Sequence, residues 1–269
     1  MKQLFRFDGS VIMEYDGTLK EALERAVKEG ICLHYADITT AYEQEKEVCG
    51  KYCLDGLQIC GLDLKGAILN DVVMPHSTFI DVNLTFAKMR RMDLFGSSLI
   101  SAKLFKANLY GSDLRFANLR GADLRKAFAS NISLTGADMT DAIIKDMDLT
   151  DAELIGVKNM ECPLSCPEEG SFYGYKKLND RYLITLLIPA DAKRSSATSN
   201  KCRCSKAEVI NILDLDTKEL IEEVSSDTYV PITYKMGKKV YPDYFDEFRW
   251  NECSSGIHFF CSREDALNY

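Results

Sequence analysis

The stretch KANLYGSDLRFANLRGADLR, residues 106–125, places a leucine at every fifth position, at 109, 114, 119 and 124. Alanine or serine stands two positions before each of these leucines. A period of five fits neither the 3.6-residue α-helix nor the two-residue β-strand. The stretch therefore predicts a repeating architecture instead of an ordinary helix or strand.

The same register continues without insertion from Leu54 to Leu154, and all 21 of its positions are apolar. The position two residues earlier holds alanine or serine in most repeats and a larger apolar residue in the others. Fixed self-similarity of this kind is typical of a solenoid, in which each unit buries its apolar residue against its neighbours.

The motif resembles the pentapeptide-repeat family, whose pattern A(D/N)LXX is visible in AKLFKANLY (102–110) and GADLR (121–125). The resemblance implies an all-β, right-handed, quadrilateral parallel β-helix with four repeats per turn and with the leucine and the small residue pointing inward. At the strand spacing of roughly 4.8 Å, about five coils would form a rod about 25 Å long. We assign residues 51–160 to this β-helix.

Residues 1–50 are expected to cover the N-terminal end of the rod, since open β edges invite aggregation. The segment around Asp8-Gly9 predicts a β-hairpin. Thr18 and Glu21 form a capping-box pattern for a helix that ends at Gly30. We interpret residues 31–50 as an irregular first coil.

The register ends near residue 160, and residues 161–269 predict a C-terminal α+β domain. Strands are expected over 171–178, 181–189, 207–215 and 229–237, and helices over 218–224 and 262–269. The domain resembles one that follows pentapeptide repeats in phage, large-virus and gut-bacterial proteins, in the segments EEGSFYGYKK (168–177), IPADAKRSSATSNKCRCSKAEV (188–209) and RWNECSSGIHFF (249–260). By analogy, the resemblance implies a phage or mobile element that manipulates a host or evades its defence.

The composition indicates a cytoplasmic protein in a reducing compartment, because no stretch resembles a secretory or membrane-spanning segment and the ten cysteines therefore need not pair. The net charge of −8 predicts no membrane association and no direct binding to nucleic acid.

The outward positions of the rod are expected to carry its function. An apolar belt adjoins a basic belt in the slot after the central residue, and we interpret one face of this belt as partner-binding, although aromatic side chains packed along the surface explain it equally well. The predicted partner-binding residues are Phe95, Ile100, Phe105, Tyr110, Arg115, Arg120 and Arg125.

The resemblance also suggests DNA mimicry, in which an acidic rod occupies the DNA groove of a topoisomerase such as gyrase. Residues 51–155 contain 13 Asp and Glu and 12 Lys and Arg, a net charge of −1. A nearly neutral rod disfavours this mechanism, although Asp141, Asp146 and Asp151 leave a local acidic stripe open.

The segment DAKRSSATSNKCRCSKA (191–207) combines cations with small hydroxyls, as phosphate-contacting loops do. An exposed basic loop without a ligand remains the alternative. If the loop folds back towards residues 249–255, Arg249 and Trp250 add a cation and a stacking surface. The predicted ligand-binding residues are Lys193, Arg194, Ser195, Ser196, Thr198, Lys201, Arg203, Arg249 and Trp250.

The cysteines of the C-terminal domain lack the paired CxxC spacing of a strong zinc site, so we expect buried thiols, no metal and no cofactor. His258, five residues after Cys253, could form a Cys–His pair with it, but an alternating strand in GIHFF favours a structural histidine.

Walker, HExxH, GxSxG and Rossmann signatures are missing, and we predict no catalytic residues. A carboxylate-based enzyme stays open because Asp243, Asp246, Glu247 and Glu252 lie close together in sequence. The sequence thus favours an interaction protein that binds and inhibits or sequesters a protein target in a bacterial host. The alternative is a C-terminal enzyme or receptor for a nucleotide or another phosphorylated molecule.

Overall fold

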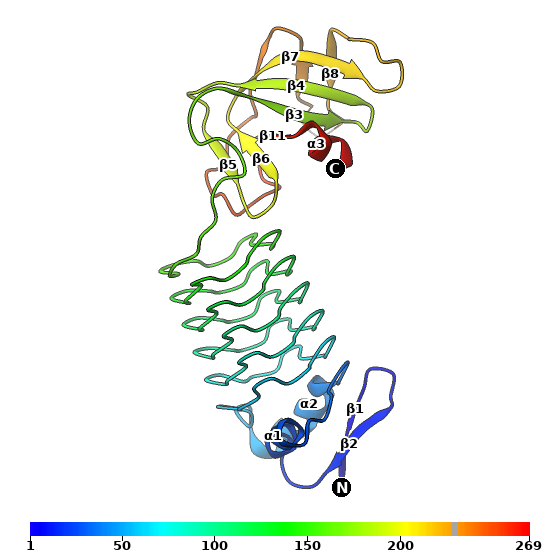
Figure 1. The fold of residues 1–269 in the computed structure, drawn as a ribbon, viewed down its shortest axis with the longest axis vertical. Coiled ribbons are helices and arrows are strands. Elements are labelled where there is room, and N and C mark those ends of the chain that lie inside the picture. The colour runs from blue at the N-terminus through cyan, green and yellow to red at the C-terminus, as the bar shows by residue number, and fades with distance from the viewer. Residues whose placement is uncertain (228–230) are drawn as a thin grey trace. The chain divides into compact units, whose positions relative to one another are not determined.

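The computed structural model describes residues 1–227 and 231–269, and of Cys49 only the backbone. The chain divides into two compact units, Met1–Glu161 and Cys162–Tyr269. Figure 1 shows stacked coils in the first unit and a curled sheet in the second. Within the described part of the chain, no helix combines the length and the apolar content that crossing a membrane requires.

The first unit begins with the predicted β-hairpin. β1 (Lys2–Phe5) pairs antiparallel with β2 (Val11–Tyr15). At the turn, the Asp8 carboxylate accepts hydrogen bonds from the Ser10 backbone N–H and hydroxyl at 2.9 and 2.7 Å.

The predicted helix follows as α1 (Leu19–Glu29). Thr18 and Glu21 form the capping box, and Gly30 ends the helix in the left-handed conformation. The helix buries Leu19, Ala22, Leu23 and Ala26, which form the face that packs against the rest of the unit.

The expected irregular first coil is wrong over most of its length, because a second helix, α2 (Ile38–Cys49), occupies it. Asp37 caps this helix by accepting a hydrogen bond from Thr40 N at 2.9 Å. The buried Glu45 carboxylate accepts a hydrogen bond from Leu19 N at 2.7 Å and so joins α2 to the start of α1. The charged run that we interpreted as coil is therefore a capped helix.

Parallel bridges in the repeat region join residues that lie 20 apart, such as Lys103 with Asp123 and Asp123 with Ile143. Leu104 N donates to Asp123 O at 2.8 Å, and Asp123 N donates to Ala102 O at 3.0 Å. Four pentapeptides therefore complete one coil, and the coils stack as Figure 1 shows. Parallel pairing and the 20-residue period agree with the expected β-helix, whose right-handedness stays a prediction from the family resemblance.

The central register is buried along the rod, and only Leu154 at its C-terminal end is partly exposed. The residue two positions after each central residue has a positive φ wherever the chain turns the corner of a coil. Gly136 occupies such a corner with a φ of 71°, and a Cβ there would lie 2.7 Å from the Phe116 ring. Bulky residues hold the same place elsewhere with φ between 52° and 61°: His76, Phe86, Arg91, Lys106, Phe116 and Lys126.

The second unit is built on a seven-stranded sheet with the order β10-β7-β4-β3-β11-β6-β5, whose neighbouring strands all run antiparallel. β8 and β9 form a separate two-stranded sheet. The strands are β3 (Phe172–Leu178), β4 (Tyr182–Ile188), β5 (Arg194–Ser196), β6 (Lys201–Cys204), β7 (Ala207–Asp214), β8 (Glu223–Ser225), β9 (Thr233–Lys235), β10 (Lys239–Val240) and β11 (Ile257–Phe260).

A short helix, α3 (Arg263–Asn268), ends the described chain and covers Leu183 and Phe260 on one face of the sheet. The larger core on the other face contains Ile184, Val209 and Phe259 among its residues. α3 is the one helix among the described residues of this unit, which is therefore closer to all-β than to the predicted α+β domain.

The predicted helix over 218–224 is wrong, because the chain turns sharply there. The Asp214 carboxylate accepts hydrogen bonds from Asp216 N and Thr217 N at 2.9 and 3.2 Å, and β8 begins at Glu223. Of the strand expected over 229–237, the part Thr233–Lys235 is present as β9. Positions 229 and 230 of the expected strand lie outside the described residues.

Candidate functional sites

The coil geometry sorts the outward side chains of the rod into four faces, because residues 20 apart lie on the same face. Faces ten residues apart along a coil lie on opposite sides, since each pentapeptide forms one of the four sides of a coil. Two opposite faces matter below. The Leu104 face comprises residues 62–66, 82–86, 102–106, 122–126 and 142–146, and the Leu94 face comprises 52–56, 72–76, 92–96, 112–116, 132–136 and 152–156.

The predicted partner-binding belt runs around the rod and does not lie on one face. Its members meet only in pairs from consecutive coils: the Arg115 guanidinium lies 5.5 Å from the centre of the Phe95 ring, and Arg125 lies 5.9 Å from that of Phe105. Arg120 and Ile100 share a third face, and Tyr110 stands on the fourth beneath the Arg90 guanidinium at 5.3 Å.

The three belt arginines are partly neutralised by aspartates. Arg115 and Arg125 pair with Asp113 and Asp123 at 2.6 and 2.7 Å, and Arg120 lies 3.7 Å from Asp138. At Asp113, burial opposes the lowering of the carboxyl pKa, but the hydrogen bonds and the charge of Arg115 outweigh it. At Asp123, the hydrogen bonds from Arg125 are the main cause of the lowered pKa. At Asp138, hydrogen bonds from Thr140 lower the pKa most, and the charge of Arg120 adds to them. The arginines alone therefore do not make the belt strongly basic.

Charge is nevertheless segregated between the two opposite faces. The Leu104 face carries six cations and three carboxylates, a net charge of +3, whereas the Leu94 face carries one cation and four carboxylates, a net charge of −3. The rod total of −1 conceals this difference. Asp141, Asp146 and Asp151 belong to three different faces, so they form no acidic stripe along the rod.

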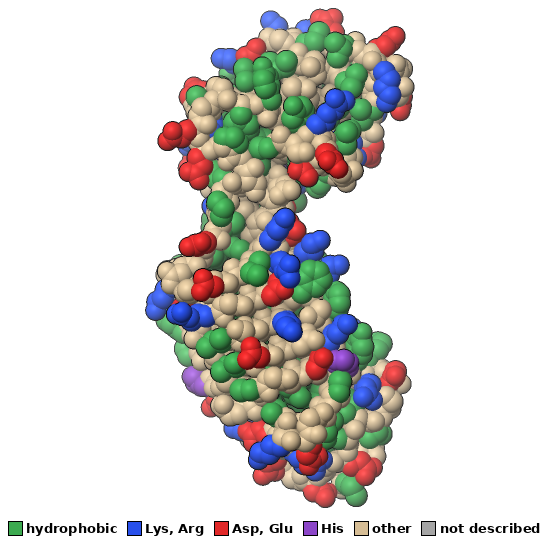
Figure 2. Space-filling model, in the orientation of Figure 1, with side chains coloured by type: hydrophobic (Ala, Val, Ile, Leu, Met, Phe, Trp, Pro, Cys, Tyr) green, Lys and Arg blue, Asp and Glu red, His purple; other side chains and the backbone are tan. Residues whose placement is uncertain are grey.

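The cationic excess of the Leu104 face comes from exposed lysines that the sequence-based prediction did not select: Lys103, Lys106, Lys126 and Lys145. None of them forms an ion pair with another described residue. The Lys106 ammonium lies 5.9 Å from the Phe86 ring centre and 5.6 Å from that of Phe105, and the two rings meet edge to face at 6.0 Å. Figure 2 shows cationic and hydrophobic side chains side by side on the middle of the rod.

In the second unit, the predicted phosphate-contacting loop is the β5–β6 hairpin, and its arginines point into the protein. Arg203 is 1% exposed and donates hydrogen bonds to the carbonyl oxygens of Asp246, Ser255 and Phe248 at 3.1, 2.9 and 3.1 Å. Burial lowers the pKa of its guanidinium. Arg203 therefore holds the 245–255 segment against the sheet through these hydrogen bonds. Its guanidinium is not free to bind a phosphate.

Arg194 and Arg249 act in the same way. Arg194 donates to the carbonyl oxygens of Pro167 and Pro189 at 2.9 and 3.0 Å, and also to that of Gly170. Arg249 donates to Ser196 O at 2.9 Å and stacks on the Trp250 ring at 4.8 Å. Arg249 and Trp250 thus do lie against the loop as predicted. The Arg249 guanidinium, however, is bound to the loop backbone and is not left free for a ligand.

The remaining predicted ligand-binding residues are also engaged or buried. Lys193 pairs with Glu247, and the Ser196 hydroxyl accepts a hydrogen bond from Ser165 N at 2.8 Å. Ser195 and Thr198 are buried and half-buried. The buried Lys201 ammonium donates to the Tyr269 hydroxyl at 2.9 Å and lies 3.5 Å from Cys253 Sγ.

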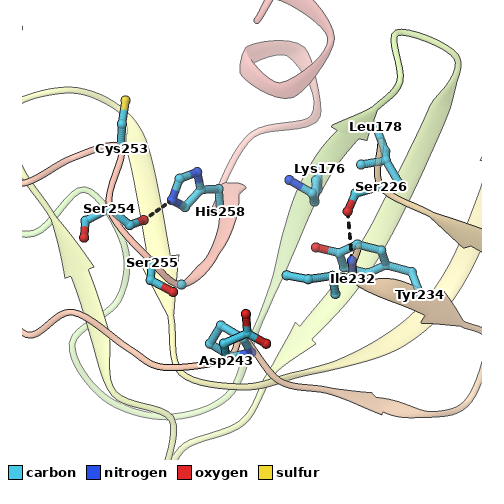
Figure 3. Close-up of a pocket in the computed structure, with 12 residues that line it drawn as sticks. Lys176, Leu178, Ser226, Ile232, Tyr234, Asp243, Cys253, Ser254, Ser255 and His258 are labelled. Carbon is cyan, nitrogen blue, oxygen red and sulfur yellow. Dashed lines mark hydrogen bonds between the residues drawn. The ribbon is translucent and has the colours of Figure 1, made fainter. Parts of the chain in front are cut away.

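A cavity of about 370 Å³ opens between β3, β9, β11 and the loops around residues 242 and 254 (Figure 3). The apolar lining residues are Leu178, Ile232, Tyr234 and Pro242, and the polar ones include Lys176, Asp243, His258 and three serines. In Figure 3, Lys176 and Ser226 stand beside Leu178 and Tyr234, and His258, Ser254 and Ser255 stand opposite them. The cavity meets the size expected of a small-molecule pocket.

Lys176 is the unusual residue of this cavity. Residues 172–178 alternate along β3, and Phe172 and Leu178 belong to the large core, so the same alternation turns Lys176 towards the interior. Burial first and then the nearby Lys201 ammonium lower the pKa of Lys176 to about 8. Within the described residues, its ammonium has no hydrogen bond and no ion pair.

His258 stands opposite Lys176 in Figure 3. Its Nε2 lies 2.8 Å from Ser254 O, so this nitrogen donates the proton and Nδ1 is left as an acceptor. Burial and the neighbouring cations lower the pKa of His258 to about 4, which keeps the ring neutral. The ring bonds to Ser254 O and not to Cys253, which gives no support to a Cys–His nucleophile.

The carboxylates expected as a possible catalytic cluster serve separate contacts. Asp246 accepts a hydrogen bond from Phe248 N at 2.9 Å, Glu247 pairs with Lys193, and Glu252 accepts one from Ser199. Asp243 alone of the four lines the cavity.

The thiols of Cys166, Cys202 and Cys261 meet in the core of the second unit. Hydrogen bonds from Cys202 lower the pKa of the other two thiols, while its own pKa is raised by these contacts and by burial. Over residues 1–227 and 231–269, no three Cys, His, Asp or Glu side chains are placed to hold a metal ion.

Comparison with known families gives two matches. The model described as pentapeptide repeats (8 copies) matches residues 61–96, 93–128 and 117–156, and the family of unknown function DUF5758 matches residues 162–266. The chain thus contains pentapeptide repeats over residues 61–156, followed by a DUF5758 match over residues 162–266. No curated protein matches it.

Solved pentapeptide-repeat structures resemble parts of this protein. Rfr23 from the cyanobacterium Cyanothece 51142 is 20% identical, covers 45% of this chain and 94% of its own, and gives a TM-score of 0.40. A protein of the Arabidopsis thaliana thylakoid lumen is 27% identical over 40% of this chain and 68% of its own, with a TM-score of 0.29. The plasmid-mediated fluoroquinolone resistance protein QnrB1 is 17% identical over 39% and 68%, with a TM-score of 0.26.

Proposed function

We propose that this pentapeptide-repeat protein is a binding protein whose Leu104 face docks on an acidic surface of a protein partner. The observation that carries the proposal is the segregation of charge, +3 on the Leu104 face against −3 on the opposite face. Complementary charge steers association and fixes orientation, so a sided rod presents one face to an acidic partner and repels it from the other.

Aromatic side chains within the basic surface support a specific contact. Phe86 is 45% exposed and is held edge to face against Phe105. Partly exposed aromatic rings beside cations have the composition of interface hot spots, because they bury a large area at a small cost in side-chain entropy.

The corner positions of the Leu104 face carry large residues in a backbone conformation that favours glycine. Phe86, Lys106 and Lys126 follow one another along the corner of this face, all with left-handed φ values between 54° and 61°. A left-handed residue with a Cβ costs about 1 kcal/mol relative to glycine, which occupies the first corner of this column at Gly66. The same conformation occurs at every corner of the rod, and bulky residues adopt it on the opposite face at His76 and Phe116, so what is particular to this column is that three large residues follow one another.

The test is quantitative capture from a bacterial lysate with Lys106→Glu/Lys126→Glu beside wild type. The control is Lys28→Glu/Lys51→Glu, which changes the net charge equally at two exposed lysines outside the Leu104 face. We expect an acidic protein to be captured by wild type and by the control, and to be lost with the first variant. Capture that survives in Lys106→Glu/Lys126→Glu would contradict the assignment to this face.

Inhibition or sequestration of that partner, in a bacterial cytoplasm and on behalf of a phage or mobile element, is the finer form of the proposal. The family resemblance alone motivates it. An activity assay on the captured partner with and without this protein tests it, and an unchanged activity would reduce the proposed function to binding.

A further inference from the structure

We propose that the cavity of the second unit binds a small organic acid, whose carboxylate pairs with the Lys176 ammonium and whose apolar part packs against Leu178, Ile232 and Tyr234. The proposed site is independent of the Leu104 face and adds a small-molecule ligand to a protein-binding rod.

The geometry of β3 supplies the first argument. Its two neighbouring lysines face opposite sides of the sheet, and only one of them has hydrogen-bond and ion-pair partners. Lys177 is satisfied by Asp180 at 3.1 Å and by Leu267 O at 3.3 Å, whereas Lys176 faces the cavity with neither kind of partner among the described residues. A half-buried ammonium without a counter-charge is costly, and an anion in the cavity lowers that cost.

The second argument concerns the rest of the lining. Nearby positive charges reinforce one another, since Lys201 acts on Lys176 and both act on His258. Lys176 lies on the same side of the cavity as Leu178 and Tyr234, and Ser254 and Ser255 add hydroxyl groups on the opposite side (Figure 3). This combination of groups fits a ligand with one anionic end and one apolar end.

The apolar part of the lining disfavours a site that binds inorganic anions by charge alone. That part would gain nothing from phosphate, whereas a ring or branched chain would bury apolar surface there. Asp243 at the cavity further disfavours a multiply charged anion.

The probe is benzoate, titrated into the full chain and followed by NMR shifts of backbone amides around the cavity. Benzyl alcohol, which lacks the carboxylate, and inorganic phosphate, which lacks the ring, are titrated in parallel. We expect benzoate to bind at least about tenfold more tightly than either, a difference that a single charge-assisted hydrogen bond can supply. Equal affinity of benzoate and benzyl alcohol, or no benzoate binding at millimolar concentrations, overturns the proposal.

The matched variants are Lys176→Met and Lys177→Met, two adjacent substitutions on opposite faces of one strand. Lys176→Met should weaken benzoate binding at least about tenfold, and Lys177→Met should leave it within about twofold of wild type. Their melting temperatures show whether each variant is folded. Folded Lys176→Met protein with wild-type affinity for benzoate overturns the proposal.

The pH dependence distinguishes Lys176 from other charges near the cavity. Benzoate affinity should fall as the pH rises through about 8, where Lys176 loses its charge. His258 stays neutral throughout because its pKa is lowered to about 4, and the pKa of Tyr234 is raised by burial. Burial opposes the charge of Lys201, but the hydrogen bond to Tyr269 and the charge of Cys253 raise its pKa overall. Asp243 is the carboxyl group that faces the same cavity.

The titration uses the Cys253→Ser background so that the thiol contributes nothing. If the affinity of the Cys253→Ser protein for benzoate did not change between pH 7 and 9, the role of Lys176 would be contradicted.

Discussion

Two regions of the protein are rich in cations, and they use them in opposite ways. In the β5–β6 hairpin, Arg194 and Arg203 turn inward and give their hydrogen bonds to backbone carbonyls. On the Leu104 face, Lys106 and Lys126 stay exposed. The difference teaches that a basic segment marks a binding site only where backbone acceptors do not already satisfy its cations.

The largest expected effect is on stability in the hairpin. Arg203→Met should lower the free energy of unfolding by about 4 kcal/mol, because it leaves three carbonyl oxygens without their charged donor in a buried place. Arg125→Met on the rod removes a guanidinium that is 50% exposed, so it should cost less than about 0.5 kcal/mol. Equal losses in urea-induced unfolding of the second unit and of the rod would break the contrast.

Lys176 is a third kind of cation, half-buried and without a hydrogen bond or ion pair to any described residue, and its replacement should change stability in the opposite direction. Its pKa is lowered from 10.5 to about 8, so the unfolded chain binds a proton more tightly than the folded one. Stability therefore rises with pH between about 8 and 10.5, and below this window Lys176 costs at most about 3 kcal/mol. Lys176→Met should raise the free energy of unfolding at pH 7, and the gain should disappear above pH 10.5.

The gain is measured against Lys177→Met, which removes the neighbouring charge on the opposite face of the strand. Destabilisation by Lys176→Met at pH 7 would show that the ammonium is already satisfied in the folded protein.

A smaller effect is expected at the corner of the Leu104 face. Lys126→Gly should stabilise the rod by about 1 kcal/mol, because glycine adopts a φ of 58° without the steric cost that lysine bears. The same change should weaken binding of the acidic partner. A variant that gains stability and keeps full affinity would remove Lys126 from the proposed interface.

Much of the rod could be predicted from sequence, since a five-residue period buries the same two positions of each repeat whatever lies elsewhere in the chain. The sided charge was also accessible: sorting charges by a 20-residue period isolates Lys103, Lys106 and Lys126, whereas summing them along the rod hides them. α2 was missed because the charged run after Asp37 shows little apolar periodicity. Its helix is fixed by Glu45, whose partner Leu19 is distant in sequence.

The hairpin could not be predicted in the same way. The composition of residues 193–206 suits a phosphate-contacting loop, but the acceptors that engage Arg203 belong to residues 246–255 and become neighbours only in the folded sheet. Lys176 lay within reach of prediction, because Phe172 and Leu178 define the inward face of an alternating strand that also includes position 176.

The most direct test of the central claim is photo-cross-linking from the two opposite faces of the rod. Phe105→p-benzoylphenylalanine places the reactive group on the Leu104 face, and Phe95→p-benzoylphenylalanine places it on the acidic face, at the same position of the repeat and with the same partial burial. After irradiation in a bacterial lysate, we expect position 105 to cross-link an acidic protein and position 95 to give none of that product. Cross-linking of the same protein from position 95 with no product from position 105 would contradict the assignment of binding to the Leu104 face.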